Sequence, residues 1–346
     1  MTKLTINNKN LMNKNTNFIL YTMLIISTIT VINSTSWISA WMGLEINMMS
    51  FIPLMMNNKN MKTSNSMMMY FIIQSISSST LMMSMLTMKM MNFLSNIFIS
   101  TLMTMSLILK LGASPFHWWI PKIINNLSWM NCLILMTWQK IAPISLMIQI
   151  STKSMIYISA LMSSLWGAIL TTNQTSLKMI LSYSSINHMG WMMLALMVNL
   201  KVTIMYYTFY SLINLIICIN FNKYNINYMN QMFKINNNKM TKLIMKSSFL
   251  SLGGIPPFTG FTPKLLVLMI LMKNSMFMEA FFMIIMTLII LTVYMNPIIS
   301  SLLMNKINNK WMNKINFKSK SNKINLFTFN LMTTLSLSMW FASKMI

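Results

Sequence analysis

Long apolar runs follow one another along the 346-residue chain, and short polar stretches separate them. Each run has about 20 residues, the length that an α-helix needs to cross the hydrocarbon core of a bilayer. We therefore predict an all-α, polytopic transmembrane bundle with about eleven helices. The predicted spans are residues 17–34, 36–56, 67–87, 93–121, 129–149, 154–172, 178–199, 202–221, 242–272, 276–302 and 325–344.

The first span has one alternative interpretation. Lys3, Lys9 and Lys14 precede an apolar run, as in a secretory signal peptide. The run is long for the apolar region of a signal peptide, and no clear A-x-A-like cleavage site follows it. We interpret it as a membrane span.

Two spans are unusually long and contain glycine and proline. The fourth (93–121) includes LGASPFHWWIP, and the ninth (242–272) includes SLGGIPPFTGFTPK. A broken helix persists in a bilayer only where protein or an aqueous cavity satisfies its backbone, and paired breaks in the two halves of a transporter indicate an ion or substrate site. The alternative is that glycine and proline are simply common in transmembrane helices.

The positions of the breaks predict an internal repeat. They fall in the fourth and ninth spans, so residues 1–346 are predicted to form one membrane domain with two five-helix repeats, at about 17–150 and 154–302. An odd number of helices places the second repeat upside down in the membrane. One further helix, at about 325–344, follows the repeats.

Composition supports a membrane protein. The chain is 55% hydrophobic and 8% charged, with a mean hydropathy of +0.58, whereas soluble domains carry about 25% charged residues. The net charge of +24 comes from 26 basic residues, all lysine, against Glu45 and Glu279. Nucleic-acid binding would require a basic patch with stacking aromatics or a known module. Most of these lysines instead lie in loops on the side of the N-terminus, which predicts an inner N-terminus and an outer C-terminus.

Among the ionisable residues within predicted spans, five fall at equivalent helices of the proposed halves. They are Glu45, Lys110, Lys140, His188 and Lys264. A charge at the bilayer centre costs at least about 2.5–3.5 kcal/mol on insertion scales, so such residues are candidates for function. A buried amine, whose proton affinity responds to burial and to nearby charge, suits proton transfer, as does an imidazole.

Structural interpretations of these residues remain open. Glu45 and Lys110 would also form a static ion pair, and Lys110 or Lys264 would also extend toward an interface. His188 would also serve as a hydrogen-bond donor between helices, and His117, beside Trp118 and Trp119, as an interfacial anchor. We interpret Glu279, in the first turn of its span, as a structural partner of the helix dipole.

Sequence motifs for cofactors are absent. Cys132 and Cys218 are far apart in spans, so they predict no metal cluster, zinc site or disulfide. The seven glycines form neither G-x-G-x-x-G nor G-x-x-x-x-G-K-[ST]. The chain is therefore expected to bind no metal, nicotinamide or redox cofactor itself.

The segments WMGLEINMMSFIPLM, LKLGASPFHWWIPKI, MTWQKIAPI, SYSSINHMGWM and SLGGIPPFTGFTPKL resemble the chain 2 family of mitochondrial NADH–ubiquinone oxidoreductase, respiratory complex I. The resemblance covers essentially the whole chain. The 47 methionines fit a protein encoded in an AT-rich animal mitochondrial genome. Animal chains of this type lack N-terminal helices that longer relatives have.

The resemblance implies an antiporter-like, proton-pumping subunit with two inverted five-helix bundles. It implies that Glu45 and Lys110 form a coupled ion pair, that Lys140 is the central relay and that Lys264 passes protons outward. His188 would assist on the same polar axis, and His117 belongs to the same candidate set. Lys122 stands where many relatives have an acidic residue, so no ion pair is carried over there.

The resemblance also implies the surroundings of the chain. It would lie in the inner mitochondrial membrane with its N-terminus in the matrix and its C-terminus on the intermembrane-space side. Its expected partners are other membrane-arm and accessory subunits and lipids that include cardiolipin. NADH, FMN, Fe–S clusters and ubiquinone would be bound by other subunits.

Two other functions fit the residues alone. One is a free-standing cation/proton exchanger built on the same repeat, and the other is a structural scaffold of the membrane arm. Buried charges without a use are costly to keep, which disfavours the scaffold. Only the resemblance separates the subunit from the exchanger.

Overall fold

The computed structural model describes the backbone of residues 2–56, 61–90, 96–150, 152–234, 239–256 and 258–307. Within these ranges the regular elements are helices, with one isolated β-bridge between Ser176 and Tyr228. The all-helical class predicted from the apolar runs is confirmed. The predicted span at 325–344 lies outside the described residues.

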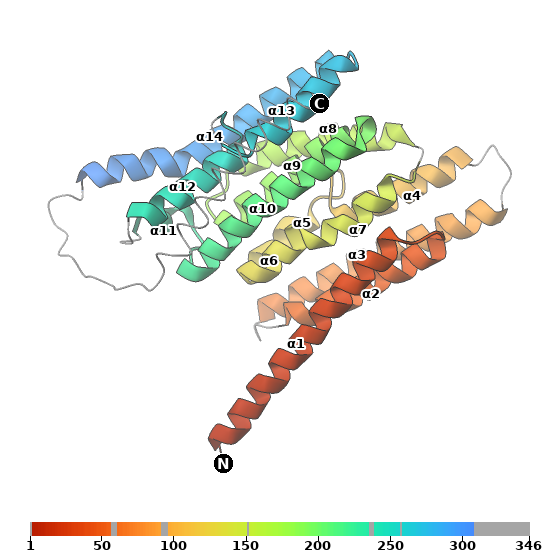
Figure 1. Ribbon diagram of the computed structural model, residues 1–346, viewed down its shortest axis with the longest axis horizontal. Helices are drawn as coiled ribbons and strands as arrows, with labels where there is room; N and C mark the ends of the chain where they lie inside the picture. The colour runs from red at the N-terminus through yellow and green to blue at the C-terminus, as the bar shows by residue number, and fades with distance from the viewer. Residues whose placement is uncertain are drawn as a thin grey trace. The chain divides into compact units, whose positions relative to one another are not determined.

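The chain divides into two compact units, Met1–Met155 and Ile156–Ile346. Figure 1 shows that each is built from helices joined by short connections. The helices of the first unit are α1 (Thr2–Ile32), α2 (Trp37–Met55), α3 (Met61–Met90), α4 (Asn96–Leu111), α5 (Trp119–Asn126), α6 (Trp129–Met136) and α7 (Trp138–Met147). Those of the second are α8 (Lys153–Thr171), which begins just before the unit boundary, α9 (Leu177–Val198), α10 (Leu200–Tyr224), α11 (Met229–Lys234), α12 (Lys239–Gly253), α13 (Phe261–Lys273) and α14 (Phe277–Ile307).

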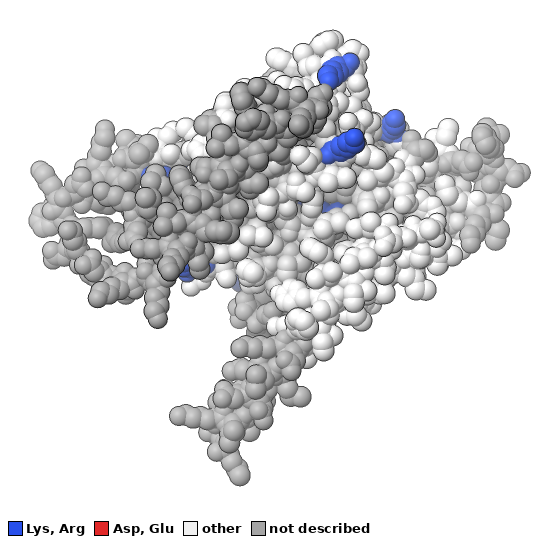
Figure 2. All heavy atoms as spheres, viewed as in Figure 1, with Lys and Arg blue, Asp and Glu red and all other residues white. Residues whose placement is uncertain are grey.

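Among the described residues, five helices are long and apolar enough to cross a membrane. They are Trp37–Met55, Met61–Met88, Lys153–Thr171, Leu200–Tyr224 and Phe277–Ile299. Thr16–Ile32 and Ile97–Leu111 are shorter apolar helices. On the face shown in Figure 2 the described surface is almost entirely uncharged, with a few separate lysines. A multi-pass membrane protein accounts for this uncharged exterior.

In the first unit, α3 packs against α2, α4 and α5, and α7 contacts α1, α2, α4 and α6. Asn131 of α6 donates from Nδ2 to the carbonyl of Leu54 at 2.9 Å, in the last turn of α2 beside Pro53. Buried polar groups need such partners in a water-poor interior. The bond therefore ties α6 to the end of α2.

In the second unit, α10 packs against α9, α12 and α13, and α14 contacts α11, α12 and α13. Small residues bring α8 close to α9. A Cβ on Gly167 would lie 2.7 Å from the backbone nitrogen of Asn187, and one on Gly190 would lie 2.7 Å from the Ala160 carbonyl oxygen. Close backbone contact at small residues is typical of helix packing in membranes.

Both predicted helix breaks are present, and both begin at a glycine. α4 ends at Leu111 before Gly112, which has a φ of 65°, and α12 ends at Gly253 before Gly254, which has a φ of 79°. Only glycine adopts this left-handed conformation without a Cβ penalty. The glycines therefore fix where each helix stops.

Span 129–149 was predicted as one helix, and this prediction is wrong. The structure divides it at Thr137, whose backbone (φ −114°, ψ −76°) separates α6 from α7. The Thr137 hydroxyl bonds the Leu133 carbonyl at 2.7 Å, and Pro143 has no amide hydrogen to donate to the carbonyl of Gln139 in the preceding turn. Lys140 therefore lies in the first turn of a short helix.

Candidate functional site

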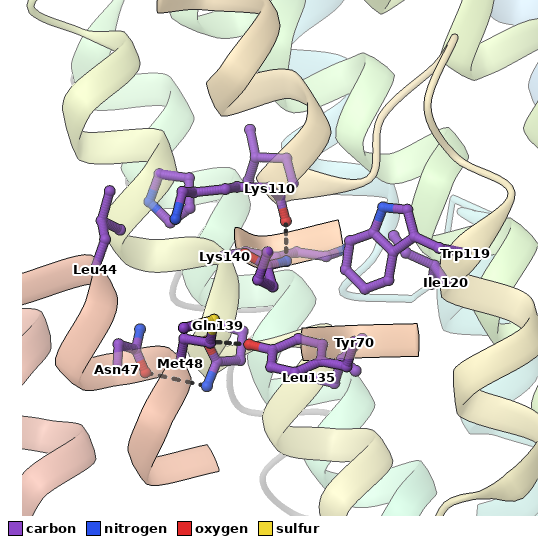
Figure 3. A pocket seen from close by; sticks show the side chains of 13 residues that line it. Leu44, Asn47, Met48, Tyr70, Lys110, Trp119, Ile120, Leu135, Gln139 and Lys140 are labelled. Atoms are coloured by element: carbon purple, nitrogen blue, oxygen red, sulfur yellow. Dashed lines mark hydrogen bonds between the residues drawn. The ribbon is translucent and has the colours of Figure 1, made fainter. Parts of the chain in front are cut away.

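A buried cavity in the first unit brings two predicted lysines together. Lys110 in the last turn of α4 is 6% exposed, and Lys140 in α7 is 2% exposed. Both side chains line one cavity of about 20 Å³, and Figure 3 labels both among the residues that surround it. Because a water molecule needs about 10–15 Å³ by this measure, the cavity has room for about one.

Uncharged polar side chains complete this cavity. Gln139 of α7 donates to Oδ1 of Asn47 in α2 at 3.1 Å, and it accepts a longer bond of 3.4 Å from the Tyr70 hydroxyl of α3 (Figure 3). Gln74 of α3 and Trp119 of α5 also face it. Four helices thus contribute polar groups beside the two amines, so a proton or a water molecule meets donors and acceptors there.

The sequence reasoning missed these uncharged residues. Asn47, Tyr70, Gln74 and Gln139 carry no formal charge, and the search for intramembrane charges does not detect them. The isolated amide of Gln74 in the apolar stretch YFIIQSIS was the available signal. An amide in such a stretch requires a buried partner.

Glu45 does not form a direct ion pair with Lys110 in the described structure. Its side chain is half-buried in α2. It nevertheless acts on Lys110 electrostatically. Two charges that interact without a contact can be coupled more weakly or strongly by small helix movements, since the energy depends on their separation.

His117 lies outside the cavity. It is half-buried in the connection between α4 and α5, and its side chain interacts with the backbone of Pro115. Beside it, Trp118 is 49% exposed, and its ring centroid lies 5.2 Å from Nζ of the exposed Lys122. A tryptophan stacked with a lysine at the surface is typical of an interfacial anchor.

In the second unit, a lysine side chain caps the end of the broken helix. Lys264, in the first turn of α13, is 7% exposed. Its Nζ donates to the carbonyl oxygens of Gly253 at 2.9 Å and Leu252 at 3.2 Å. These are the last carbonyls of α12, where the negative end of the helix dipole attracts a cation.

His188 belongs to a second buried polar group. Its Nδ1 lies 2.8 Å from the hydroxyl of Tyr206, and its ring centroid lies 5.1 Å from that of Tyr210. A cavity of about 10 Å³ beside these residues also touches Ser251 and Leu252 of α12. His188 therefore lines a cavity that Leu252 also lines, and Lys264 donates to the carbonyl of the same Leu252.

Glu279 has a partner that sequence reasoning missed. Tyr157 of α8 donates its hydroxyl hydrogen to Oε1 of Glu279 at 2.6 Å, in the first turn of α14. Both residues are partly exposed. Glu279 thus joins two helices as well as lying at a helix start.

Comparison with known proteins gives the family. Residues 34–292 match the family model described as NADH:quinone oxidoreductase/Mrp antiporter, transmembrane. The chain belongs to this family. A chain named NADH-ubiquinone oxidoreductase chain 2 from Anopheles gambiae is 42% identical over 93% of this chain and 96% of its own length. Its namesake from Locusta migratoria is 40% identical over 87% and 88%.

Two solved structures share the fold. A chain of respiratory complex I from Thermus thermophilus matches with a TM-score of 0.78 and 16% identity, over 93% of this chain and 78% of that one. A chain of an Mrp complex from Dietzia matches with a TM-score of 0.74 and 14% identity, over 80% of this chain. The present chain spans 58% of the length of that Mrp chain.

Proposed function

We propose that this chain is a proton-translocating subunit in the membrane arm of respiratory complex I. It lies in the inner mitochondrial membrane, with its N-terminus in the matrix and its C-terminus on the intermembrane-space side. Support comes from the family, from the name of the relatives at about 40% identity and from the apolar helices. NADH, FMN, Fe–S clusters and ubiquinone belong to other subunits in this proposal.

The observation that carries the proposal is the cavity shared by Lys110 and Lys140. Two amines in one small, water-poor space repel each other when both are charged, so a proton on one disfavours a proton on the other. A change in the distance between Glu45 and Lys110 alters this balance. The interaction gives a way to load and unload Lys140 without any redox group in the chain.

The proposed mechanism is indirect coupling. Electron transfer in other subunits changes the conformation or field along the membrane arm and alters the Glu45–Lys110 interaction. Lys140 then loses its proton, which leaves toward the outer side by way of Lys264, with His188 assisting. At each step a protonated group becomes neutral and the proton passes to the next site.

The architecture that we propose for the whole chain has eleven spans. Two inverted five-helix repeats each contain one broken helix, α4–α5 and α12–α13, and a C-terminal helix follows. The matching glycine ends of α4 and α12 support a repeat. Neighbouring membrane-arm and accessory subunits, and lipids that include cardiolipin, are the proposed partners.

A native gel of mildly solubilised mitochondrial membranes tests the assignment to the complex. The gel is stained for NADH oxidation, and the chain is located by mass spectrometry. We expect the chain to migrate with a very large NADH-oxidising band. A small separate band without NADH oxidation would support the free-standing exchanger and would contradict the coupled mechanism.

The scaffold alternative makes a different prediction for the cavity. If the chain only holds the arm together, replacement of Lys110 or Lys140 changes assembly and nothing else. A proton-translocating subunit loses pumping in complexes that assemble normally.

A further inference from the structure

A histidine–tyrosine pair is buried between α9 and α10. His188 is 6% exposed and Tyr206 is 1% exposed, and Nδ1 of the histidine lies 2.8 Å from the tyrosine hydroxyl. A hydroxyl donates or accepts, and the role of an imidazole nitrogen depends on the tautomer. The direction of this one bond therefore decides where neutral His188 carries its proton.

The surroundings of Tyr206 decide that direction. Among the residues that the structure describes, the Tyr206 hydroxyl has Nδ1 of His188 as its hydrogen-bond partner and no second one. If Nδ1 carried the proton, the tyrosine would accept and its own buried hydrogen would have no acceptor. Buried donors without an acceptor are strongly disfavoured. The hydroxyl therefore donates to Nδ1, and neutral His188 carries its proton on Nε2.

The pair borders the broken helix of the second unit. The cavity beside His188 and Tyr206 is also lined by Ser251, Leu252 and Gly260, at the end of α12 and the start of α13. The carbonyl of Leu252 accepts a hydrogen bond from Lys264. At about 10 Å³ the cavity is close to the smallest space that holds one water molecule.

We propose that Tyr206 is the positioning residue for His188. Its hydroxyl holds the neutral imidazole as the Nε2–H tautomer and fixes the ring beside the cavity. When His188 takes a second proton at Nδ1, the Tyr206 oxygen accepts from Nδ1–H, and the hydroxyl hydrogen turns into the cavity, where the described residues offer it no acceptor. Release of that proton reverses the rotation.

The role of this pair in proton transfer rests on the proposed function, whereas the tautomer does not. Tyr206 donates to the imidazole and is not itself a proton carrier in this account. Loss of its hydroxyl should therefore change the tautomer of His188 while the helix packing stays the same. A purely structural tyrosine would leave the tautomer unchanged.

Infrared difference spectroscopy on the assembled complex with isotope-labelled histidine tests this proposal. The tautomer-sensitive ring band of His188 is identified by its loss in His188→Gln. We expect the Nε2–H form in the unchanged chain and in the control Tyr207→Phe, and a mixture of tautomers in Tyr206→Phe. The Nδ1–H form in the unchanged chain, or an unaltered band in Tyr206→Phe, would overturn the assignment.

Proton pumping on the same samples tests the positioning role. We expect Tyr206→Phe to lower the protons moved per NADH oxidised, with NADH oxidation and assembly retained, and Tyr207→Phe to leave the ratio unchanged. An altered tautomer with a normal ratio would overturn the positioning role. The band of the unchanged chain decides the tautomer even where Tyr206→Phe does not assemble. Normal pumping in Lys140→Met would count against the proposed function and would leave the tautomer standing.

Discussion

Helices α4 and α12 end in the same backbone motif, yet different groups cover their last carbonyls. In α4, Gly112 N–H bonds the Leu109 carbonyl and Ala113 N–H bonds that of Ile108. In α12, Gly254 N–H bonds the Ser251 carbonyl and Ile255 N–H bonds that of Leu250. Each pair is a Schellman motif closed by a glycine with positive φ.

The two helices differ in the side chains that donate to their last carbonyls. At the end of α4 the donors are neutral: Trp119 Nε1 bonds the Leu109 carbonyl at 3.2 Å and Gln74 Nε2 bonds that of Lys110 at 3.4 Å. At the end of α12 the donor is the amine of Lys264. Neutral caps leave the amine of Lys110 for the cavity, whereas Lys264 is engaged by its own broken helix. At the first break the lysine amine (Lys110) lines the cavity, whereas at the second break the lysine amine (Lys264) bonds the carbonyls at the end of α12.

The largest effect is expected where the second break cannot accept a side chain. A Cβ on Gly260 would overlap the carbonyl oxygen of Ser251, a backbone atom that cannot move away alone. Gly260→Ala should therefore abolish most assembly of the complex, measured as the amount of NADH-oxidising band on a native gel. Gly253→Ala is the matched control, because its Cβ would first meet Tyr294 Cδ2 at 3.5 Å, an ordinary contact. Equal assembly of the two variants would contradict the close packing of this break.

Replacing each lysine in turn tests whether Lys264 acts as a helix cap and Lys110 as a cavity residue. Lys110→Met and Lys264→Met each remove a buried amine, but only Lys264→Met leaves two helix-end carbonyls without their donor. A buried acceptor without a partner costs about 1–3 kcal/mol, so Lys264→Met should lower the dissociation temperature of the complex more than Lys110→Met does. Both should lower pumping. Equal dissociation temperatures of the two variants would contradict the claim that only Lys264 caps a helix end.

The neutral cap of α4 gives a smaller effect. Gln74→Leu removes the donor to the Lys110 carbonyl. The loss should lower the stability of the complex by about 1 kcal/mol, because the bond is long and both of its partners are neutral. The change should also alter pumping, since Gln74 lines the cavity of Lys110 and Lys140. Ser75→Ala is the control on the same helix, where the hydroxyl bonds only its own turn at Ile72. Thermal dissociation and pumping of the two variants are compared, and indistinguishable results would exclude Gln74 as a cap.

The smallest effect is expected at the partly exposed bond between α8 and α14. Tyr157→Phe removes the hydroxyl that donates to Glu279 at 2.6 Å. Bonds to a charged acceptor contribute about 1.5–3 kcal/mol when buried, and solvent lowers this to about 1 kcal/mol or less at a partly exposed site. The dissociation temperature should fall slightly, with pumping unchanged. A loss of pumping would instead place Glu279 in the proton path.

The two helix ends also show which features could be predicted from the sequence. Long apolar runs predicted the helices, and Gly112 and Gly254 marked both breaks because positive φ requires glycine at low cost. Charge alone identified Lys110, Lys140 and Lys264. The partners of these lysines were not predictable, because a carbonyl that accepts from Lys264 is present at every position and carries no sequence signal.

Uncharged polar groups account for most of what the sequence did not predict. Gln74, Gln139 and Tyr206 look ordinary in apolar helices, and their importance comes from what lies opposite them in space. The division at Thr137 is equally hidden, because threonine is common in intact helices. One signal was available: Tyr206, Tyr210 and Asn214 recur at every fourth position of α10, which predicts a polar stripe on one helix face.

The most direct test of the account is the number of protons moved per NADH oxidised in vesicles that contain the assembled complex with Lys140→Met. The account predicts a lower ratio than for the unchanged complex, with NADH oxidation and assembly preserved, because the amine is lost from the cavity while, in the proposed function, the redox centres belong to other subunits. Ile141→Leu, next along the same helix, is the control for repacking and should keep the ratio. A normal ratio in Lys140→Met would contradict the claim that the Lys110–Lys140 cavity carries the proton.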